Sequence, residues 1–156
     1  METLLLVGLF LVYRTVTAVL MQFIVRSIPY LGFFPYKAEL DLYRLPFSIS
    51  SLANFDGIHY LQIAKVGYQQ YTEAFFPLFP LIIRYVGILF NHNYLIAGIV
   101  VANMAFIAAI IAWRKYVFEL YGKPHISNWA VLFMVAYPTS FFWGQCIRRV
   151  CLCFLS

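Results

Sequence analysis

The chain has 156 residues, of which 63% are hydrophobic and only 11% are charged. A soluble domain averages about 45–50% apolar and about 25% charged residues, so the composition excludes a soluble α-helical domain and predicts an integral membrane protein. The net charge of +5 does not indicate nucleic-acid binding, because no basic run with interleaved polar loops is present. The lysines and arginines are instead expected at helix ends, facing the anionic headgroups of membrane lipids.

The first predicted element is a transmembrane helix over residues 3–25, which is long enough to cross a hydrocarbon core of about 30 Å. A cleavable signal peptide is the alternative, but the chain begins Met1-Glu2 without positive charge and no small-residue cleavage site follows. Arg14 lies near the middle of the span and is expected to face the interior of a helix bundle. There it either packs structurally, with its charge extended toward the interface, or pairs with an anionic substrate or a carboxylate.

A long loop is predicted over residues 27–73, because no clean spanning run occurs there. Its first part is interrupted by Pro29, Pro35 and Pro46. Its second part contains NFDGIHYLQIAKVGY, residues 54–68, which is predicted to be a helix. Four polar residues of this helix fall within about a third of its circumference: His59, Gln62, Lys65 and Gln69. A narrow polar strip on a broad apolar surface is typical of an amphipathic helix lying in the membrane interface.

Asp56 stands at the N-terminus of this predicted helix, and two interpretations of it stay open. As a helix N-cap, its carboxylate would accept backbone N–H bonds and contribute about 1 kcal/mol. As a general base at the membrane surface, it would take the proton of a substrate hydroxyl that attacks a sugar. His59 taken alone is more often a structural interfacial residue than a ligand or an acid.

Three further spans are predicted over residues 75–90, 94–113 and 128–144. Prolines are tolerated in a first helical turn, so the helix proper of the first of these is expected from about Phe79. The fold class is therefore all-α, a polytopic transmembrane helix bundle with four spans and one long loop. In this topology the long loop lies on the same face as residues 114–126. Both segments carry basic residues, which would make that face cytoplasmic under the positive-inside rule.

Three motifs, FDGIHYLQIAKVGY, AFFPLFPLIIR and AYPTSFFWG, follow one another within roughly residues 50–144. Together they resemble the PIG-V family of membrane mannosyltransferases, which is associated with adding the second mannose to the GPI anchor precursor. The resemblance implies a GT-C fold and an inverting transfer of mannose from a polyprenyl or dolichyl phosphate mannose to a glycolipid acceptor. No nucleotide or metal cofactor is implied. Phe55 stands where family members typically have Trp.

The resemblance also implies roles for single residues. Asp56 occupies the position of the catalytic base in the first non-cytoplasmic loop. This placement of the loop conflicts with the cytoplasmic side that the positive-inside rule gives for it. His59, Glu73, Arg84 and Arg14 are the candidate substrate-binding residues. Arg84 is expected either to bind the donor phosphate bidentately or to form a structural ion pair, and Glu73 is either an exposed loop acid or part of the site. The membrane would be the plasma membrane in a prokaryote and that of the endoplasmic reticulum in a eukaryote.

Residues 145–156, QCIRRVCLCFLS, change character. They hold all three cysteines without the spacing of a zinc site, and Arg148 and Arg149 fall where an apolar run is expected. Family members continue after the FFxG motif with a sequence similar to AVYTESLFL, and codons permitted by this tail can read VYTESLFVFL in a shifted frame. We therefore predict an out-of-frame tail, and that residues 1–144 are the N-terminal part of a transferase that is inactive as a fragment.

A non-enzymatic membrane protein, such as a small transporter or an assembly subunit, is the alternative function. Arg14 and Arg84 within apolar segments, together with the helix-breaking prolines, would fit a translocation path. A transporter places its charged groups at mid-membrane, whereas a GT-C enzyme places its acid on an interfacial loop helix. The position of Asp56 favours the enzyme.

Overall fold

The computed structural model describes residues 2–28, 36–53 and 55–137, and the regular structure in these ranges is entirely helical. This confirms the all-α class for the described part of the chain. The elements in chain order are α1 (Glu2–Ser27), α2 (Lys37–Asp41), α3 (Phe47–Ser50), the 3₁₀ helix η1 (Ser51–Ala53), α4 (Asp56–Val66), α5 (Leu78–Leu89), α6 (Tyr94–Tyr121) and α7 (Pro124–Ala136).

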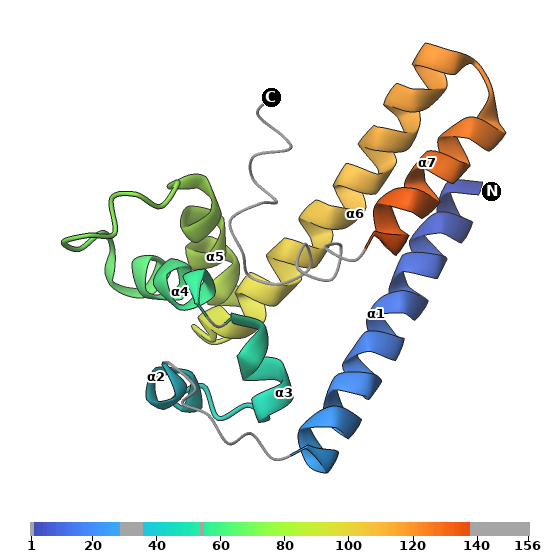
Figure 1. Ribbon diagram of the computed structural model, residues 1–156. Coiled ribbons are helices and arrows are strands. Elements are labelled where there is room, and N and C mark those ends of the chain that lie inside the picture. Colours follow the sequence, from blue (N-terminus) through green and yellow to red (C-terminus); the bar gives the residue numbers. More distant parts are fainter. Residues whose placement is uncertain (1, 29–35, 54, 138–156) are drawn as a thin grey trace.

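The long helices α1, α6 and α7 lie side by side and contact one another (Figure 1). Their shared core is made of six buried side chains: Leu6, Phe10, Phe106, Ile110, Val131 and Val135. The rings of Phe10 and Phe106 are 4.9 Å apart between centroids. Gly122 ends α6 in the left-handed conformation at φ 64°, and Pro124 begins α7, which is the usual placement of these two residues at helix ends.

A second core forms where α4 and α5 pack against the N-terminal half of α6. Tyr60 of α4 is almost completely buried and meets Phe75 and Phe79 edge to face, with ring centroids 5.1 Å apart in each pair. Gly87 of α5 allows α6 to approach closely, because an added Cβ would lie 2.8 Å from the Cδ1 atom of Tyr94. This core fixes α4, the helix that carries Asp56.

Two stretches are long and apolar enough to cross a membrane, Leu4–Ile24 in α1 and Tyr94–Tyr121 in α6. The 28 residues of α6 span about 42 Å at 1.5 Å per residue, more than the hydrocarbon core of about 30 Å. The predicted span 75–90 forms only the 12-residue helix α5, which reaches about 18 Å and is too short to cross. The predicted span 128–144 belongs to a helix that begins earlier, at Pro124, and its residues from 138 onward lie outside the described ones.

The short length of α5 has a local cause at each end. Pro77 takes the N-cap position, and the helix ends at a turn in which Asn91 and His92 both have positive φ, 51° and 62°. The His92 N–H bonds back to the Gly87 carbonyl at 2.8 Å, which closes this turn and directs the chain into α6.

The apolar side of α4 is covered by protein, which differs from the interfacial arrangement expected for it. Five of its apolar residues are at most 5% exposed: Ile58, Tyr60, Leu61, Ile63 and Ala64. They pack on α5, α6 and η1, so the broad apolar surface needs no lipid to bury it. His59 and Gln62 are half-buried and Lys65 is exposed, so the polar strip remains the outer face of this helix.

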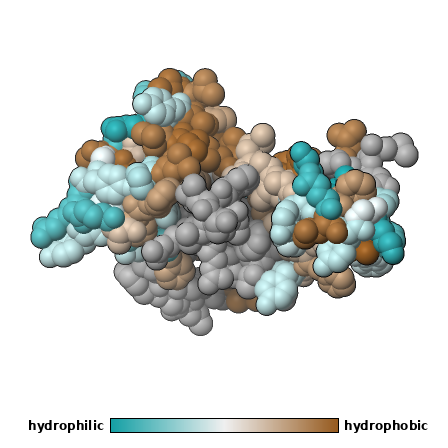
Figure 2. Space-filling view, turned by 90° about the horizontal axis from the view of Figure 1, so that it is seen from above, coloured by the Kyte–Doolittle hydropathy of each residue, from teal (hydrophilic) through white to brown (hydrophobic). Residues whose placement is uncertain are grey.

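Exposed apolar side chains are concentrated on the long helix α1 and on α5. Leu4 is 79% exposed, Phe23 is 67% exposed, and Leu89 of α5 is 82% exposed. Figure 2 shows a broad hydrophobic (brown) area on the left half of the face seen from above, with hydrophilic residues (teal) at its left edge. Apolar surface of this extent marks a membrane or a protein partner.

Candidate functional site

Asp56 is the first residue of α4, and Phe55 takes the N-cap position without a side-chain capping bond. The cap position predicted for Asp56 is therefore wrong by one residue. Phe55 has φ 55° and ψ −121°, a conformation that L-residues rarely adopt and that favours glycine. The Asp56 carboxylate is half-buried, and among the described residues it has no hydrogen-bond or ion-pair partner.

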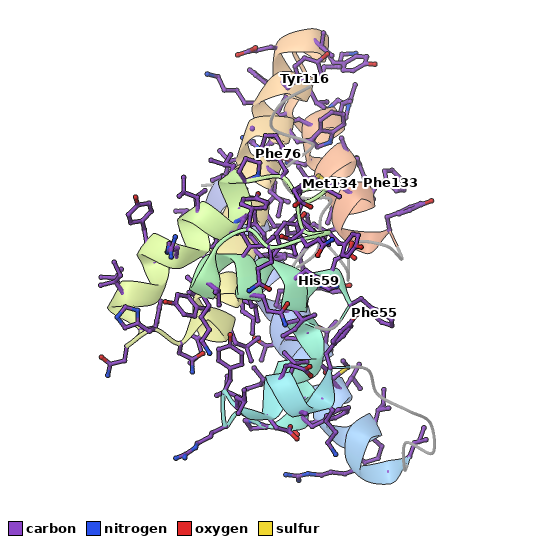
Figure 3. All side chains as sticks on the ribbon, turned by 90° about the vertical axis from the view of Figure 1, so that its left-hand side faces the viewer. Phe55, His59, Phe76, Tyr116, Phe133 and Met134 are labelled. Atoms are coloured by element: carbon purple, nitrogen blue, oxygen red, sulfur yellow. The ribbon has the colours of Figure 1, made fainter. Side chains whose placement is uncertain are left out.

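His59 follows Asp56 by three residues on α4, and its surroundings are aromatic. Its ring centroid is 5.5 Å from that of Tyr36 and 5.2 Å from that of Phe75. Figure 3 shows His59 near the start of α4 and Phe55 directed away from the core, where it is 66% exposed. Tyr36, at the start of α2, and Phe75, in the loop after α4, thus both contact the His59 ring.

A hydrogen bond from Tyr68 stabilises the loop after α4. The Tyr68 hydroxyl donates a hydrogen bond of 2.7 Å to the Phe75 carbonyl. Loss of hydration raises the pKa of the Tyr68 hydroxyl, because it disfavours the phenolate. The hydroxyl therefore remains a donor to a higher pH than an ordinary tyrosine hydroxyl does. The bond holds Phe75 in the aromatic group around His59.

The predicted site residues do not meet in one pocket of the described structure. Asp56 and His59 share the first turn of α4, whereas Glu73 is exposed in the following loop and Arg84 is exposed on α5. Arg14 is half-buried on α1 and lines a cavity against α3. The structure therefore brings together the acid and the histidine, and it separates the other three from them.

A cavity of about 640 Å³ lies between α2, α4 and the turn from α5 to α6; its wall is partly apolar, and we call it the polar cavity after the ten polar residues that line it. Its lining comprises Glu39, Leu42, Tyr43, Arg44, Ile58, Gln62, Lys65, Val66, Gln69, Asn91, His92, Asn93 and Tyr94. Three residues of the predicted polar strip, Gln62, Lys65 and Gln69, face this cavity. The sequence interpretation missed the rest of its polar lining. The only signal was the polar tripeptide Asn91-His92-Asn93 between two apolar helices.

Local hydrogen bonds stabilise the segments that form the wall of this cavity, and Arg44 in this wall has a left-handed backbone conformation. Arg44 has φ 54°, and its N–H bonds to the Asp41 carbonyl at 3.0 Å. The Asn93 side chain caps α6 by accepting from the Ile96 N–H at 3.2 Å, and His92 Nδ1 lies 3.2 Å from the Tyr94 hydroxyl. The polar part of the lining consists of four amides, two phenols, a histidine, two cations and one acid, which suits a ligand rich in hydroxyl groups that also carries negative charge.

A second, smaller cavity of about 170 Å³ lies between α1 and α3. Its lining comprises Arg14, Thr17, Ala18, Met21, Gln22, Ser48, Ile49 and Leu52. The Thr17 hydroxyl is already engaged, since it donates to the Arg14 carbonyl at 2.9 Å. This cavity shares no lining residue with the larger one.

Metal binding has no support in the described ranges, where no group of three or more His, Cys, Asp or Glu residues could hold an ion. The three cysteines lie outside those ranges. Comparison with known protein families, curated proteins and solved structures finds no match for this chain. The resemblance to the PIG-V family therefore stays a prediction.

Proposed function

We propose that this chain is part of a membrane glycosyltransferase that moves mannose from a polyprenyl or dolichyl phosphate mannose to a glycolipid acceptor, such as a GPI precursor. The observation that carries the proposal is the Asp56 carboxylate, which is half-buried and unpartnered among the described residues. A general base must be free of competing bonds and within reach of the hydroxyl that it deprotonates. An acid engaged as a helix cap would lack this freedom.

The proposed chemistry is an inverting displacement. Asp56 takes the proton of an acceptor hydroxyl, and the hydroxyl oxygen attacks the anomeric carbon of the mannose. The bond between that carbon and the phosphate oxygen breaks, and the lipid phosphate leaves with the bonding electrons. This reaction needs no nucleotide, since the energy of transfer resides in the glycosyl phosphate bond of the donor.

The polar cavity is the proposed binding site for the acceptor headgroup. Lys65, in its wall, lies nine residues beyond Asp56 on α4, about 13 Å along the helix axis. An acceptor that reaches both must be an extended glycan rather than a single sugar. Arg44 and Lys65 would bind a phosphate or another anionic group on it, while the side-chain amides of Gln62 and Asn91 would bind its hydroxyls.

The test is mannose transfer from polyprenyl phosphate mannose in isolated membranes. It compares the 156-residue chain with a longer chain whose reading frame is restored after residue 144. We expect transfer by the longer chain and a loss of at least a hundredfold in Asp56→Asn at equal expression. Asp41→Asn removes an exposed acid from α2 and should leave transfer unchanged.

Transfer that survives Asp56→Asn would exclude Asp56 as the base. Absence of transfer by both chains would favour the non-enzymatic alternative, in which Arg14 and Arg84 belong to a translocation path.

A further inference from the structure

The helix α5 presents an apolar side that no described part of the protein covers. Its other side packs on α4 and α6. The uncovered side carries exposed apolar and aromatic side chains: Leu78, Leu81, Ile82, Tyr85, Ile88 and Leu89. Because α5 reaches only about 18 Å, a membrane crossing does not account for this surface.

The position of α5 relative to the membrane follows from α6, to which it is joined by a tight turn. Residues 94–113 of α6 contain no charged side chain, and their length of about 30 Å matches the thickness of the hydrocarbon core. The charged residues of α6 begin directly after them, at Arg114. Tyr94, at the other end, therefore lies at one surface of the core.

The helix α5 runs back beside the first part of α6 (Figure 1). Near the end of α5, Gly87 lies against the Tyr94 ring, and near its start Phe79 belongs to the same core as Val101 of α6. The end of α5 is therefore at the surface that Tyr94 marks. Its first residue, Leu78, lies deeper, toward the middle of the hydrocarbon core.

The side chains along α5 change in the order that this depth requires. Residues 74–83 contain no charged side chain. Arg84 is exposed and lies about 8 Å before the end of the helix, and Tyr85 beside it is 64% exposed. Long cationic side chains extend from within a bilayer to its headgroups, and tyrosines gather at the same level. The polar turn, residues 91–93, then comes at the surface itself.

The backbone at the deep end of α5 has few groups that would need water. In hydrocarbon the protein must satisfy every backbone N–H and C=O group, and Pro77 and Pro80 carry no N–H. The Leu81 N–H bonds to the Pro77 carbonyl at 3.1 Å, and the Phe75 carbonyl accepts the hydrogen bond of the Tyr68 hydroxyl. Pro77 takes the N-cap position without a side-chain bond. Such a start suits lipid better than water, where a polar cap is usual.

We infer that residues 74–89 form a re-entrant segment, which enters one leaflet of the membrane on the side of α4 and returns to the same surface through α5. The exposed side of α5 contacts the acyl chains of that leaflet, beside those that surround α6. This places the contact with lipid on α5 instead of α4, whose apolar side is covered by protein. The inference does not rest on the proposed sugar transfer, since it uses only helix lengths, burial and the order of side chains.

The experiment measures the depth of single nitroxide spin labels on the 156-residue chain, with its native cysteines replaced by serine, in vesicles of phosphatidylcholine and phosphatidylglycerol. Leu78→Cys, Ile82→Cys and Leu89→Cys place the label on the exposed side of α5. Collisions with oxygen, which enters the bilayer, are compared with collisions with a water-soluble nickel chelate. We expect the ratio of oxygen to nickel collisions to fall about tenfold from position 78 to position 89, with position 82 between them, because the hydrocarbon core excludes the chelate.

Two control positions calibrate the ratio. Met104→Cys labels an exposed position within the crossing part of α6, and its ratio should be at least as high as that at position 78. Leu42→Cys labels a leucine that is 74% exposed beside the polar cavity. Nickel should reach this label freely, which shows that an exposed leucine is not by itself a sign of lipid.

Three results would overturn the inference. Equal ratios at positions 78, 82 and 89 would mean that α5 lies flat on the membrane or outside it. A maximum at position 82, with low ratios at both ends, would mean that the segment crosses. Protection of all three labels from both oxygen and nickel would mean that another protein chain, such as a second copy of this one, covers α5.

Discussion

Phe55 combines a strained backbone with an exposed side chain, directly before the candidate base. Its φ of 55° and ψ of −121° belong to a region where a residue with a Cβ loses about 1–3 kcal/mol. The ring itself is 66% exposed, so its burial contributes little to the stability of the fold. Strain of this kind persists where the surrounding structure enforces it, and it concentrates at functional sites. At Phe55 it sets the direction in which Asp56 enters α4.

Replacing Phe55 by glycine tests this strain. Glycine adopts such a conformation freely, at a cost of about 0.4–1 kcal/mol from the greater freedom of the unfolded chain. We therefore expect Phe55→Gly to raise the free energy of unfolding by about 1 kcal/mol, measured by thermal or denaturant unfolding in detergent. Phe55→Ala, which keeps a Cβ, should show no such gain. Equal stability of the two variants would argue against strain at this position.

At the scale of elements, the contact between α5 and α6 depends on the absence of a side chain at Gly87. An alanine Cβ there would lie 2.8 Å from Cδ1 and 3.0 Å from Cε1 of Tyr94. The Tyr94 ring would have to move, and it lines the polar cavity with its hydroxyl 3.2 Å from His92 Nδ1. Any shift of α6 away from α5 would therefore also reshape that cavity.

We expect Gly87→Ala to lower the free energy of unfolding by about 1–2 kcal/mol, since overpacking outweighs the better helix propensity of alanine. Gly8→Ala is the matched control: it lies in α1 with no atom within 4 Å of the added Cβ and should be neutral or stabilising. Denaturant unfolding of both variants measures the difference. A stabilising Gly87→Ala would show that α5 and α6 are packed less closely than described.

The sequence predicted the helices whose signals are local, and it failed where tertiary contacts decide. The bounds of α1, the extent of α5 with its helix proper from about Phe79, and the starts of α4 and α6 were predicted within a few residues. The end of α6 was not: the helix runs to Tyr121 rather than to 113, and in this extension the Nε of Arg114 donates to the Oδ1 of Asn128 in α7 at 3.0 Å. The polar cavity was also beyond reach, since packing alone brings Arg44, Gln62 and Asn93 together from segments far apart in the chain.

At the scale of the whole molecule, the number of crossing helices decides which segments share a face of the membrane. Four spans would place the loop before α5 and the turn after α6 on the same side. Within the described residues only α1 and α6 are long and apolar enough to cross, and two crossings would place these segments on opposite sides. Figure 1 shows α1 and α6 running in opposite directions, with the N-terminus near the α6–α7 end. In such a topology the two basic segments fall on opposite sides of the membrane, and the resemblance implies that the side carrying α4 is the non-cytoplasmic one, with Arg114, Lys115 and Lys123 on the cytoplasmic side.

Single cysteines distinguish the two topologies. In a chain whose native cysteines are replaced by serine, Gln70→Cys reports on the exposed loop after α4, and Lys123→Cys reports on the exposed turn between α6 and α7. We expect a membrane-impermeant maleimide applied to sealed cells to label the cysteine at 70. The cysteine at 123 should react only after permeabilisation, because two crossings separate the turn from the loop and the resemblance implies that the loop is the non-cytoplasmic of the two. Labelling of both from the same side would require a second crossing between them in addition to α6, a span that the 12 residues of α5 are too short to provide.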